Sequence, residues 1–522
     1  MSLTKKIYHQ RGEHMMAQGV LPFKYQEEKK EGGMTALAGL PAYLDLAHVV
    51  GLRDSITRHV RVRQGEQGWT DAQVVLSLVL LNLAGGDCVD DLRILEGDEG
   101  FCRVLERIEV HGINRKERRG LQRRWRRERH RVVPSPSSVF RYLSKFHDEE
   151  QERNRQPHRA YIPRRNVHLE GLGMVNRDVV SFVQGRSPQS VATLDIDATV
   201  VETNKEEALY SYRGFKAYQP LNVYWAEQDL LVHSEFRDGN VPAGYEKLRV
   251  CKEVLGHLPE GIERVYLRTD TAGYQRDLLK HCAEGKDERF GVIEFAIGVD
   301  VTEEFKKAVV EVEDGEWHPL RRKLKGKWVD TGQQWAEVCF VPNWVGHSKK
   351  GPDYRYLAIR EPLVGQLAFS GMEDQLPFPT MEFREGGGYK VFGVVTNRTI
   401  SGDDLIRWHR GRCGKSEEAH SVMKEDLAGG KFPSRDFGEN AAWWAMMILA
   451  FNLNSAMKRL VLGEGWVSKR LKAIRFALIN LPGRIMERSR QLIVRLACGH
   501  PSNEILFDAR KRILCLANAP PD

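Results

Sequence analysis

Hydrophobic and polar positions along the chain predict a helical N-terminal part. From about residue 41 to residue 110 apolar side chains recur at helical spacing, whereas residues 1–40 are polar and irregular. The segment WTDAQVVLSLVLLNLAGG begins with a capping-box pair, Thr70 and Gln73, and its apolar run stops at Gly85 and Gly86. We therefore expect a buried helix here, within an N-terminal all-α region.

From residue 190 the pattern changes to strands that alternate with helices. Strands rich in β-branched residues are predicted in SVATLDIDATVVET, YQPLNVYWAEQDLLVHSEF (two strands), IERVYLRTD and RFGVIEFAIGVDV. Helices are predicted in PAGYEKLRVCKEVLGHL and YQRDLLKHCAE. The order is β-β-β-α-β-α-β, and three strands before the first helix exclude a Rossmann pattern.

Short β-like runs separated by Gly, Pro and Asn follow at residues 300–385. They are KAVVEVED, EWHPLRRKL, WAEVCFVPN and YRYLAIRE, and we interpret them as a β-rich insertion. The segment YKVFGVVTN then returns to a buried strand, and a long helix is expected from Ser401, with Asp404 as its second capping signal.

The most apolar helix is predicted in NAAWWAMMILAFNLNSAMKRLVL, which approaches the length of a membrane span. Asn452, Asn454 and Lys458 interrupt it, so we expect a core helix and no membrane partner. The tail from 465 to 522 is expected to be helical and basic.

Together these elements predict an α/β protein in which helices flank a mixed sheet that a β-rich insertion interrupts. The predicted regions are an N-terminal helical region at 1–185, the first part of the α/β core at 186–299, the insertion at 300–386, the second part of the core at 387–460, and a helical C-terminal tail at 461–522.

Composition narrows the class of protein. The 522 residues include 79 Lys plus Arg against 71 Asp plus Glu, and the net charge of +8 suits a polyanionic partner without requiring one. The eight cysteines are scattered and form no CxxC pair, so neither a zinc ribbon nor a disulfide framework is expected. With no apolar signal-peptide core near the N-terminus, these features predict a soluble cytoplasmic protein with reduced thiols.

The densest charge run, RKERRGLQRRWRRERHR at 115–131, holds ten Lys or Arg and two Glu. The short helix predicted after it has Ser135 as N-cap and Pro136 at its first position, and it resembles the second helix of a helix-turn-helix. This pattern predicts DNA contact in the N-terminal region; the alternative is a solvated basic loop joined to an ordinary amphipathic helix. The candidate DNA contacts are Arg123, Arg124, Arg126, Arg127 and Arg141.

Three acidic residues are candidates for chemistry. Asp197 lies on the first predicted strand, and Asp270 ends the fourth, at the sheet edge where α/β proteins place ligands. If strands one and four are neighbours, these carboxylates face each other. Glu417 lies on the helix expected at 402–427 and shares a face with Arg410 and Lys424, because the three are spaced by seven residues.

Three carboxylates that converge on one point repel one another unless a cation lies between them. Mg²⁺ prefers oxygen ligands, and two such ions about 4 Å apart can activate an attacking oxygen and stabilise a leaving one in phosphodiester chemistry. In that scheme Asp197 bridges the ions, and Asp270 and Glu417 each complete one. The alternative is that each acid is a turn, cap or surface residue.

The segments LDIDAT, LRTDTAGYQ and EEAHSVMKEDLAGG resemble the DDE transposases of bacterial insertion sequences, in the DDE-domain group with a β-strand insertion before the catalytic Glu. The resemblance implies an RNase H-like core and a catalytic triad of Asp197, Asp270 and Glu417 that uses Mg²⁺ or Mn²⁺. It implies a homodimer that binds double-stranded DNA, both terminal inverted repeats and target, cuts the element free and joins its 3′ ends to the target.

The family's Tyr-Arg-Glu-Lys signature is only partly present. Lys424 fits its lysine, which implies contact with DNA phosphate. Arg410 occupies the tyrosine position and Cys413 the arginine position, with Arg412 one step away, so the role of those two positions is open. Both arginines remain candidates for DNA contact.

Two alternative metal ligands and one aromatic candidate also follow from the resemblance. Asp195 shares a strand face with Asp197, and Thr199 favours Asp197 as the ligand. Glu418 is adjacent to Glu417, and only Glu417 has the right distance to a lysine. In transposases that cut through a DNA hairpin, an aromatic residue of the insertion stacks on a flipped base. The candidates are Trp317, Trp328, Trp335 and Trp344, although ordinary core packing is expected for at least three of them.

Two other functions fit the same residues. One is an RNase H-like nuclease that cuts DNA without strand transfer. The other is a catalytically inactive relative that only binds DNA through its basic region.

Overall fold

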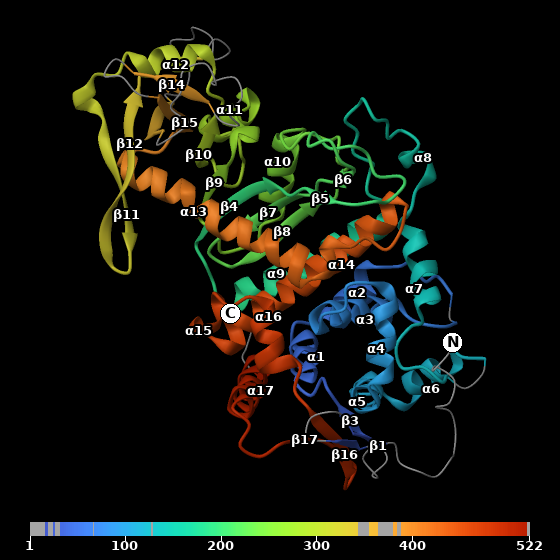
Figure 1. The fold of residues 1–522 in the computed structure, drawn as a ribbon. Coiled ribbons are helices and arrows are strands. Elements are labelled where there is room, and N and C mark those ends of the chain that lie inside the picture. Colours follow the sequence, from blue (N-terminus) through green and yellow to red (C-terminus); the bar gives the residue numbers. More distant parts are fainter. Residues whose placement is uncertain are drawn as a thin grey trace, which may run out of the picture.

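The computed structural model describes residues 16–18, 24–26, 32–65, 67–126, 129–342, 354–363, 379–383 and 388–518. Arg127 and Trp344, two of the residues singled out above, lie outside the described residues. Helices and strands occupy most of the described chain (Figure 1).

A ten-stranded mixed sheet runs through the described residues in the order β11-β12-β13-β15-β10-β9-β4-β7-β8, with β14 beside β15. Its strands are β4 (Val191–Ala198), β7 (Leu221–Trp225), β8 (Leu230–Glu235), β9 (Arg264–Thr269), β10 (Glu294–Val299), β11 (His318–Leu324), β12 (Lys327–Val338), β13 (Arg355–Pro362), β14 (Thr380–Glu382) and β15 (Gly388–Thr396).

The centre of this sheet has the strand arrangement expected from the sequence. β4 runs antiparallel to β7 and parallel to β9, and β9 runs parallel to β10. The first and fourth predicted strands are therefore neighbours, as expected. Because β4, β9 and β10 are parallel, residues that follow their carboxyl ends meet at one edge of the sheet.

The insertion extends the main sheet instead of forming a separate one. β12, β13 and β15 pair antiparallel, and β15 joins them to β10. One predicted strand is wrong: the first half of KAVVEVED lies in helix α12 (Glu303–Val310), and the second half follows that helix without forming a strand. Thr302 caps that helix through the backbone N–H of Phe305, and Phe305 and Val309 are buried one helical turn apart.

Helices cover the sheet and form the N-terminal region. They are α1 (Leu40–Val49), α2 (Leu52–His59), α3 (Asp71–Ala84), α4 (Leu92–Gly97), α5 (Glu99–Glu109), α6 (Arg115–Arg123), α7 (Pro136–Leu143), α8 (Glu149–Glu152), α9 (Val167–Arg186), α10 (Lys247–His257), α11 (Arg276–Ala283), α13 (Gly402–Ser421), α14 (Phe437–Ala456), α15 (Glu464–Val467), α16 (Leu471–Ile474) and α17 (Ser502–Asn518). Thr70 and Gln73 form the predicted capping box of α3, and Gly85 ends the helix with φ of 103°.

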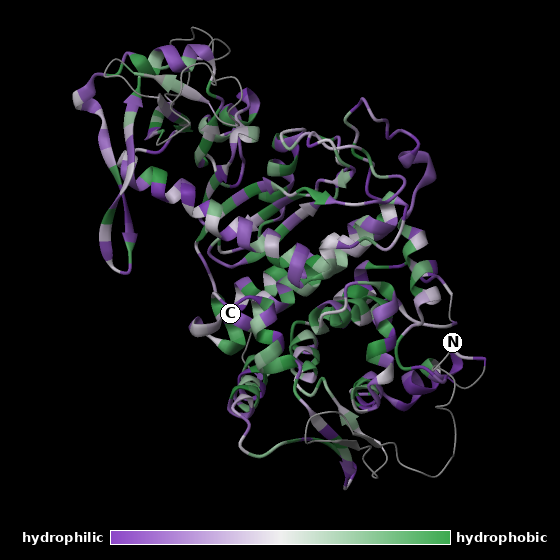
Figure 2. Cartoon of the chain, in the orientation of Figure 1, coloured by the Kyte–Doolittle hydropathy of each residue, from purple (hydrophilic) through white to green (hydrophobic). Residues whose placement is uncertain are grey.

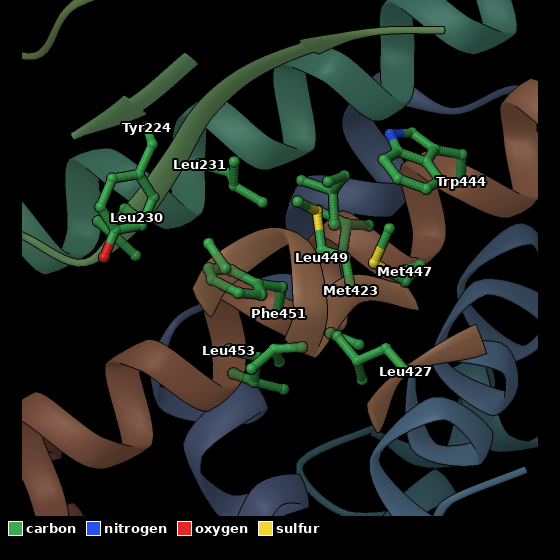
Figure 3. Close-up of a cluster of buried hydrophobic side chains, with 14 of the residues drawn as sticks. Tyr224, Leu230, Leu231, Met423, Leu427, Trp444, Met447, Leu449, Phe451 and Leu453 are labelled. Atoms are coloured by element: carbon green, nitrogen blue, oxygen red, sulfur yellow. The ribbon is translucent and has the colours of Figure 1, made fainter. Parts of the chain in front are cut away.

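Helix α14 lies at the centre of the protein. It packs against α9 and β8 on one side and against α1 and α3 on the other (Figure 1). Figure 3 shows Met447, Leu449 and Phe451 of this helix among side chains from β8 and from the segment after α13. The N-terminal helices therefore share one hydrophobic core with the sheet.

The segment Phe437–Leu462 is long and apolar enough to cross a membrane, but 72% of its most apolar stretch is buried inside the protein. Its polar interruptions have partners: Asn452 donates to Asn176 Oδ1 at 2.7 Å and accepts from the backbone N–H of Leu231 at 2.9 Å. Apolar stretches of the same helix appear green beneath the sheet in Figure 2. α14 is a core helix in this fold, as predicted.

The C-terminal tail is helical only in part. β16 (Gly483–Arg488) and β17 (Gln491–Leu496) form a hairpin, and β16 also pairs with β3 (Met34–Thr35) near the other end of the chain. The prediction of a wholly helical tail is wrong, as is that of an all-α N-terminal region. Ser489 and Arg490 adopt the positive φ values of a tight hairpin turn without the Asn or Gly that usually marks one.

Candidate active site

The two predicted aspartates lie at the same edge of the main sheet. Asp197 is the next-to-last residue of β4, and Asp270 directly follows β9. Ile196 and Thr269, the residues before them, are paired in the parallel register. The strand order therefore brings these carboxylates together, close enough for the charge of Asp270 to raise the pKa of Asp197.

Asp270 is held by a buried cation. Lys247, the first residue of α10, donates to Asp270 Oδ1 at 3.2 Å and to Thr269 Oγ1 at 2.7 Å. The lysine side chain is fully buried, whereas 38% of the Asp270 side chain is exposed. Burial alone would raise the pKa of Asp270, but Lys247, Arg412 and the Thr269 hydroxyl bring it below its ordinary value.

Asp197 is held by a cation from α13. Arg412 donates to Asp197 Oδ2 at 2.8 Å, and both side chains are largely buried. Burial is the main reason why the pKa of Asp197 is raised to about 6; the charge of Asp270 raises it further, whereas Arg412 and Lys247 lower it. Asp197 and Asp270 thus form a pair of like charges that two protein cations keep together.

Asp195, the alternative on the same strand, has a different environment. It is completely buried, and both of its carboxylate oxygens accept hydrogen bonds from Arg268, at 2.6 and 2.8 Å. Arg268 also donates to the backbone carbonyl of Trp408 at 2.6 Å. This bidentate pair joins β4 and β9 to α13 and leaves neither carboxylate oxygen open to solvent.

Helix α13 crosses the sheet edge next to the two aspartates. Ser401 caps it through the backbone N–H of Asp404, as predicted, and His409 lies 3.1 Å from the carbonyl oxygen of Thr269. Figure 1 shows the helix running from the insertion to the centre of the molecule. Its contacts through His409 and Arg412 fix its position over the ends of β4 and β9.

Glu417 lies further along α13 than Arg412. It is exposed and makes no hydrogen bond or ion pair within the described part of the chain. Its neighbour Glu418 lines a separate cavity of about 330 Å³ together with Tyr224 and Asp229. Glu418 likewise makes no hydrogen bond or ion pair among the described residues, so the two glutamates differ in the surface that they face and not in their partners.

The three predicted acids do not form a closed cluster in this structure. Two groups of three potential ligands within 4.8 Å occur among the described residues, and neither contains these acids. The groups are Asp87, Cys88 and Asp91, and His233, Glu235 and Glu253. Arg237 and Arg249 already bind Glu235, so the second group is a network of ion pairs.

Lys424 is not on a regular helix. The sequence predicts a continuous helix over 402–427, but Val422–Asp426 forms a π-helical stretch after α13. In a regular α-helix Lys424 would share a face with Glu417. The wider π-helical turn rotates Lys424 away from that face. Lys424 is half-buried and lies close enough to His420 to lower the pKa of that histidine, although burial is the larger cause.

The basic N-terminal run is divided between structural and exposed arginines. Arg124 donates to the carbonyl oxygens of Gly68 and Gly65, and so joins α6 to the loop before α3. Arg123, Arg126 and Arg141 are exposed. Residues 124–135 separate α6 from α7, too long a connection for the short turn of a helix-turn-helix, so that resemblance is not confirmed.

The insertion tryptophans also differ from one another. Trp317 is buried against Phe383 and Arg360, as expected of a core residue. Trp335 is half-buried and donates to Asp403, whereas 56% of Trp328 is exposed and the Arg407 guanidinium lies over its ring. Base stacking by one of them stays a prediction.

Two residues of this site escaped the sequence analysis. Lys247 lies in a helix that follows Glu246, which adopts a left-handed conformation with φ of 51° and gives no capping signal. Asp300 follows β10 at the same sheet edge, where burial and the charge of Asp270 raise its pKa. A strand followed directly by an aspartate, as in β9, is the signal that could have found Asp300.

The chemistry of these side chains fits a divalent cation. Carboxylate oxygens are the ligands that Mg²⁺ and Mn²⁺ prefer. Asp270 Oδ2 has no hydrogen-bond partner among the described residues, and the mutual repulsion of Asp197 and Asp270 favours a cation beside them. Asp195, whose oxygens are both occupied, does not fit this role.

Comparison with known proteins places the chain in a family. No curated protein matches the sequence. Among solved structures, a chain of a cryo-EM structure of the piggyBac transposase synaptic complex with hairpin DNA aligns with 94% of this chain and 85% of that one, with 11% identity and a TM-score of 0.39. The family described as transposase DDE domain group 1 matches residues 26–349 and 380–518. The chain belongs to this family, and it is a DDE transposase, an enzyme of metal-dependent DNA cleavage and transfer.

Proposed function

We propose that this transposase binds the terminal inverted repeats of an insertion sequence, cuts the DNA there and transfers the 3′ ends to target DNA. The observation that carries the proposal is the pair Asp197 and Asp270, which end neighbouring parallel strands and are each held by a protein cation. The proposed enzyme acts in the cytoplasm as a homodimer in which two copies hold the two ends of the element.

In this proposal Asp197, Asp270 and Glu417 hold Mg²⁺ or Mn²⁺, with two ions per site. When bound, such ions activate an attacking oxygen and stabilise the leaving oxygen in phosphodiester chemistry. Lys247 and Arg412 fix one oxygen of each aspartate, so that the carboxylates are oriented before DNA arrives. Glu417, which has no hydrogen-bond or ion-pair partner among the described residues of the chain, supplies the third carboxylate.

DNA contact is proposed for cations that form no ion pair within the described part of the chain; of these, Arg410 donates to the neutral side chain of Gln333. Lys424 and Arg410 flank Glu417 along α13 and its extension, and Arg123, Arg126 and Arg141 are exposed on the N-terminal region. Arg412 and Arg124 have protein partners, so the proposed role of these two arginines is to hold Asp197 and the loop before α3.

A cleavage and joining assay tests the proposal. The substrate is DNA that carries the element's own ends, with Mg²⁺ and then Mn²⁺, and the parent protein is compared with Asp270→Asn. We expect the parent to cut and join, and Asp270→Asn to bind DNA equally well without cutting it. Asp277→Asn, the same change at an exposed residue of α11, is the matched control and should behave as the parent.

The other outcomes are informative in different ways. A parent that cuts without joining is a nuclease of the same fold, and a parent that binds without cutting in either metal is an inactive relative. If Asp270→Asn cuts as well as the parent, the assignment of the active site is wrong.

A further inference from the structure

The hairpin formed by β11 and β12, residues 318–338, projects from the body of the protein beside α13 (Figure 1). We call it the arm. Its strands are joined by Lys325 and Gly326, with φ of 47° and 84°, and Leu324 pairs with Lys327 across this two-residue turn. Positive φ at both turn positions matches the twist of the strands, so the arm is a regular hairpin.

The outer half of the arm is strongly basic, and its cationic side chains have no partner among the described residues. Its five cationic side chains are exposed, and none of them forms an ion pair or a hydrogen bond within the described part of the chain. No acidic residue occurs between His318 and Val329. The register places Asp330 opposite Arg321 and apolar residues opposite Arg322, Lys323 and Lys327, so no two cations face each other across the strands. Five cations without an ion pair on one short hairpin still create a strongly positive surface, and this arrangement points to a partner of opposite charge. The cations are Arg321, Arg322, Lys323, Lys325 and Lys327.

A groove of about 510 Å³ separates the arm from α13. Two of its arginines, Arg321 and Arg322, come from the arm, and two, Arg407 and Arg410, come from the helix. Among the described residues, no carboxylate lines the groove. Arg407 is paired with Asp403 and Asp404, whereas Arg410 donates to Gln333 at 2.6 Å and has no carboxylate partner among the described residues.

Two tryptophans hold the arm against the helix. Trp335 donates to Asp403 Oδ1 at 3.0 Å, and its ring packs so closely on Gly402 that a side chain there would have no room. At the outer end, the Arg407 guanidinium lies 4.7 Å from the centre of the Trp328 ring. The groove therefore keeps its shape without a ligand.

We propose that the arm and α13 together bind the sugar–phosphate backbone of double-stranded DNA. This inference rests on the proposed function and adds a DNA-binding surface to it. The inner end of the groove is at Arg410 and Gly411, directly before Arg412, which binds Asp197. A DNA strand that leaves the acidic site along α13 enters the groove. There, guanidinium, amide and hydroxyl groups can donate hydrogen bonds to its phosphate oxygens.

The test measures how DNA affinity depends on salt. The probe is a fluorescent DNA duplex of arbitrary sequence, and its dissociation constant is measured over a series of NaCl concentrations. The arm variant replaces all five cations of the arm by Gln. The control variant removes five exposed cations that are already paired with carboxylates, namely Arg93, Arg153, Lys286, Lys431 and Lys511.

The affinity falls as salt rises, and we expect this slope of log affinity against log salt to become less steep by about 0.9 for each phosphate contact that the arm variant loses. The control variant should keep most of the parent's slope. At low salt the arm variant should bind at least tenfold more weakly. All replaced residues are exposed, and equal thermal midpoints confirm the fold. If the fivefold variant melts early, Lys323→Gln/Lys327→Gln carries the same test.

Equal slopes for the parent and the arm variant overturn the proposal. The partner of the arm would then be an acidic protein surface and not DNA. This result is independent of catalysis, because the duplex need not be cut. If the parent cleaves DNA but the slopes of parent and arm variant are equal, only the role of the arm is rejected. If the slopes differ but the parent cleaves DNA in neither metal, only the proposed reaction is rejected.

Discussion

Lys247 donates to the carboxylate of Asp270 from a fully buried position, 3.2 Å from Oδ1. An unpaired ammonium would not remain charged at such a site, and burial does lower the pKa of Lys247. The pair also includes the Thr269 hydroxyl, 2.7 Å from Lys247 Nζ. It therefore ties the start of α10 to the carboxyl end of β9, where the proposed chemistry takes place.

Replacing Lys247 by Met should reduce cleavage at least tenfold while leaving DNA binding unchanged. Methionine fills the space, but Asp270 loses the cation that orients it and lowers its pKa. The pKa of Asp270 then rises, so the acid side of the pH–rate profile should move to higher pH. Rates measured across pH for the parent and Lys247→Met test this.

Thr269→Val is the matched comparison, because it removes the hydroxyl and keeps the cation. A smaller loss of rate is expected, with a smaller displacement of the profile. An unmoved profile in Lys247→Met would show that the lysine only fills space.

Replacing Arg412 by Gln should destabilise the metal-free protein by about 3 kcal/mol, because it leaves Asp197 largely buried and without a counter-charge beside Asp270. A divalent cation held by the aspartates replaces the missing charge. Mg²⁺ should therefore raise the thermal midpoint of Arg412→Gln more than that of the parent, which calorimetry with and without Mg²⁺ measures.

Arg268→Gln provides the control, since it breaks a similar buried pair at Asp195, which is not one of the proposed metal ligands. It should be destabilised without any extra benefit from Mg²⁺. The same Mg²⁺ response in both variants would mean that the cation binds elsewhere.

Local signals in the sequence were sufficient for many elements. The capping residues Thr70, Ser135 and Ser401 lie where the pattern predicts them, because a cap depends on three or four neighbouring residues. The proximity of Asp197 and Asp270 was also predictable, since it follows from strand order alone.

Features that depend on distant residues were not predictable. Arg412 binds an aspartate 215 positions away, and Lys247 binds one 23 positions away, without any sequence motif that links them. The β16–β17 hairpin turns at Ser489 and Arg490, which are not turn residues by preference. The π-helical stretch after α13 likewise has no sequence signal, and it changes the direction of Lys424.

His420, one turn beyond Glu417, is fixed in its neutral form by a chain of hydrogen bonds. The Trp444 indole, which can only donate, donates to Ser234 Oγ at 2.8 Å, and Ser234 donates to Asn222 Oδ1 at 2.7 Å. The Asn222 amide then faces His420 Nε2 at 3.3 Å, so that nitrogen is the acceptor. Burial lowers the pKa of His420 to about 4.

This lowered pKa predicts a loss of stability in acid. Above the ordinary histidine pKa of about 6.5 both the folded and unfolded forms are neutral, and the stabilisation is fully present. As the pH falls from there to about 4, only the unfolded chain takes up the proton, so folding should lose about 3 kcal/mol. In His420→Gln, which accepts the same hydrogen bond without titrating, this part of the pH dependence should disappear.

Urea unfolding between pH 7 and pH 4 measures the difference between the parent and His420→Gln. His158→Gln, a change at an exposed histidine, should follow the parent. If His420→Gln also follows the parent over the whole range, His420 is not held neutral by this network.

Two glycines of α13 give the last prediction, because their surroundings are opposite. A Cβ at Gly402 would lie 2.2 Å from the nearest atom of the Trp335 ring, whereas nothing lies within 4 Å of a Cβ at Gly414. Gly402→Ala should therefore cost about 1–3 kcal/mol through overpacking, and Gly414→Ala should stabilise the helix by about 0.5–1 kcal/mol. Because Trp335 holds the arm, Gly402→Ala should also reduce the salt dependence of DNA binding, which Gly414→Ala should preserve. Equal stability and equal salt dependence in the two variants would show that Trp335 does not fasten the arm to the helix.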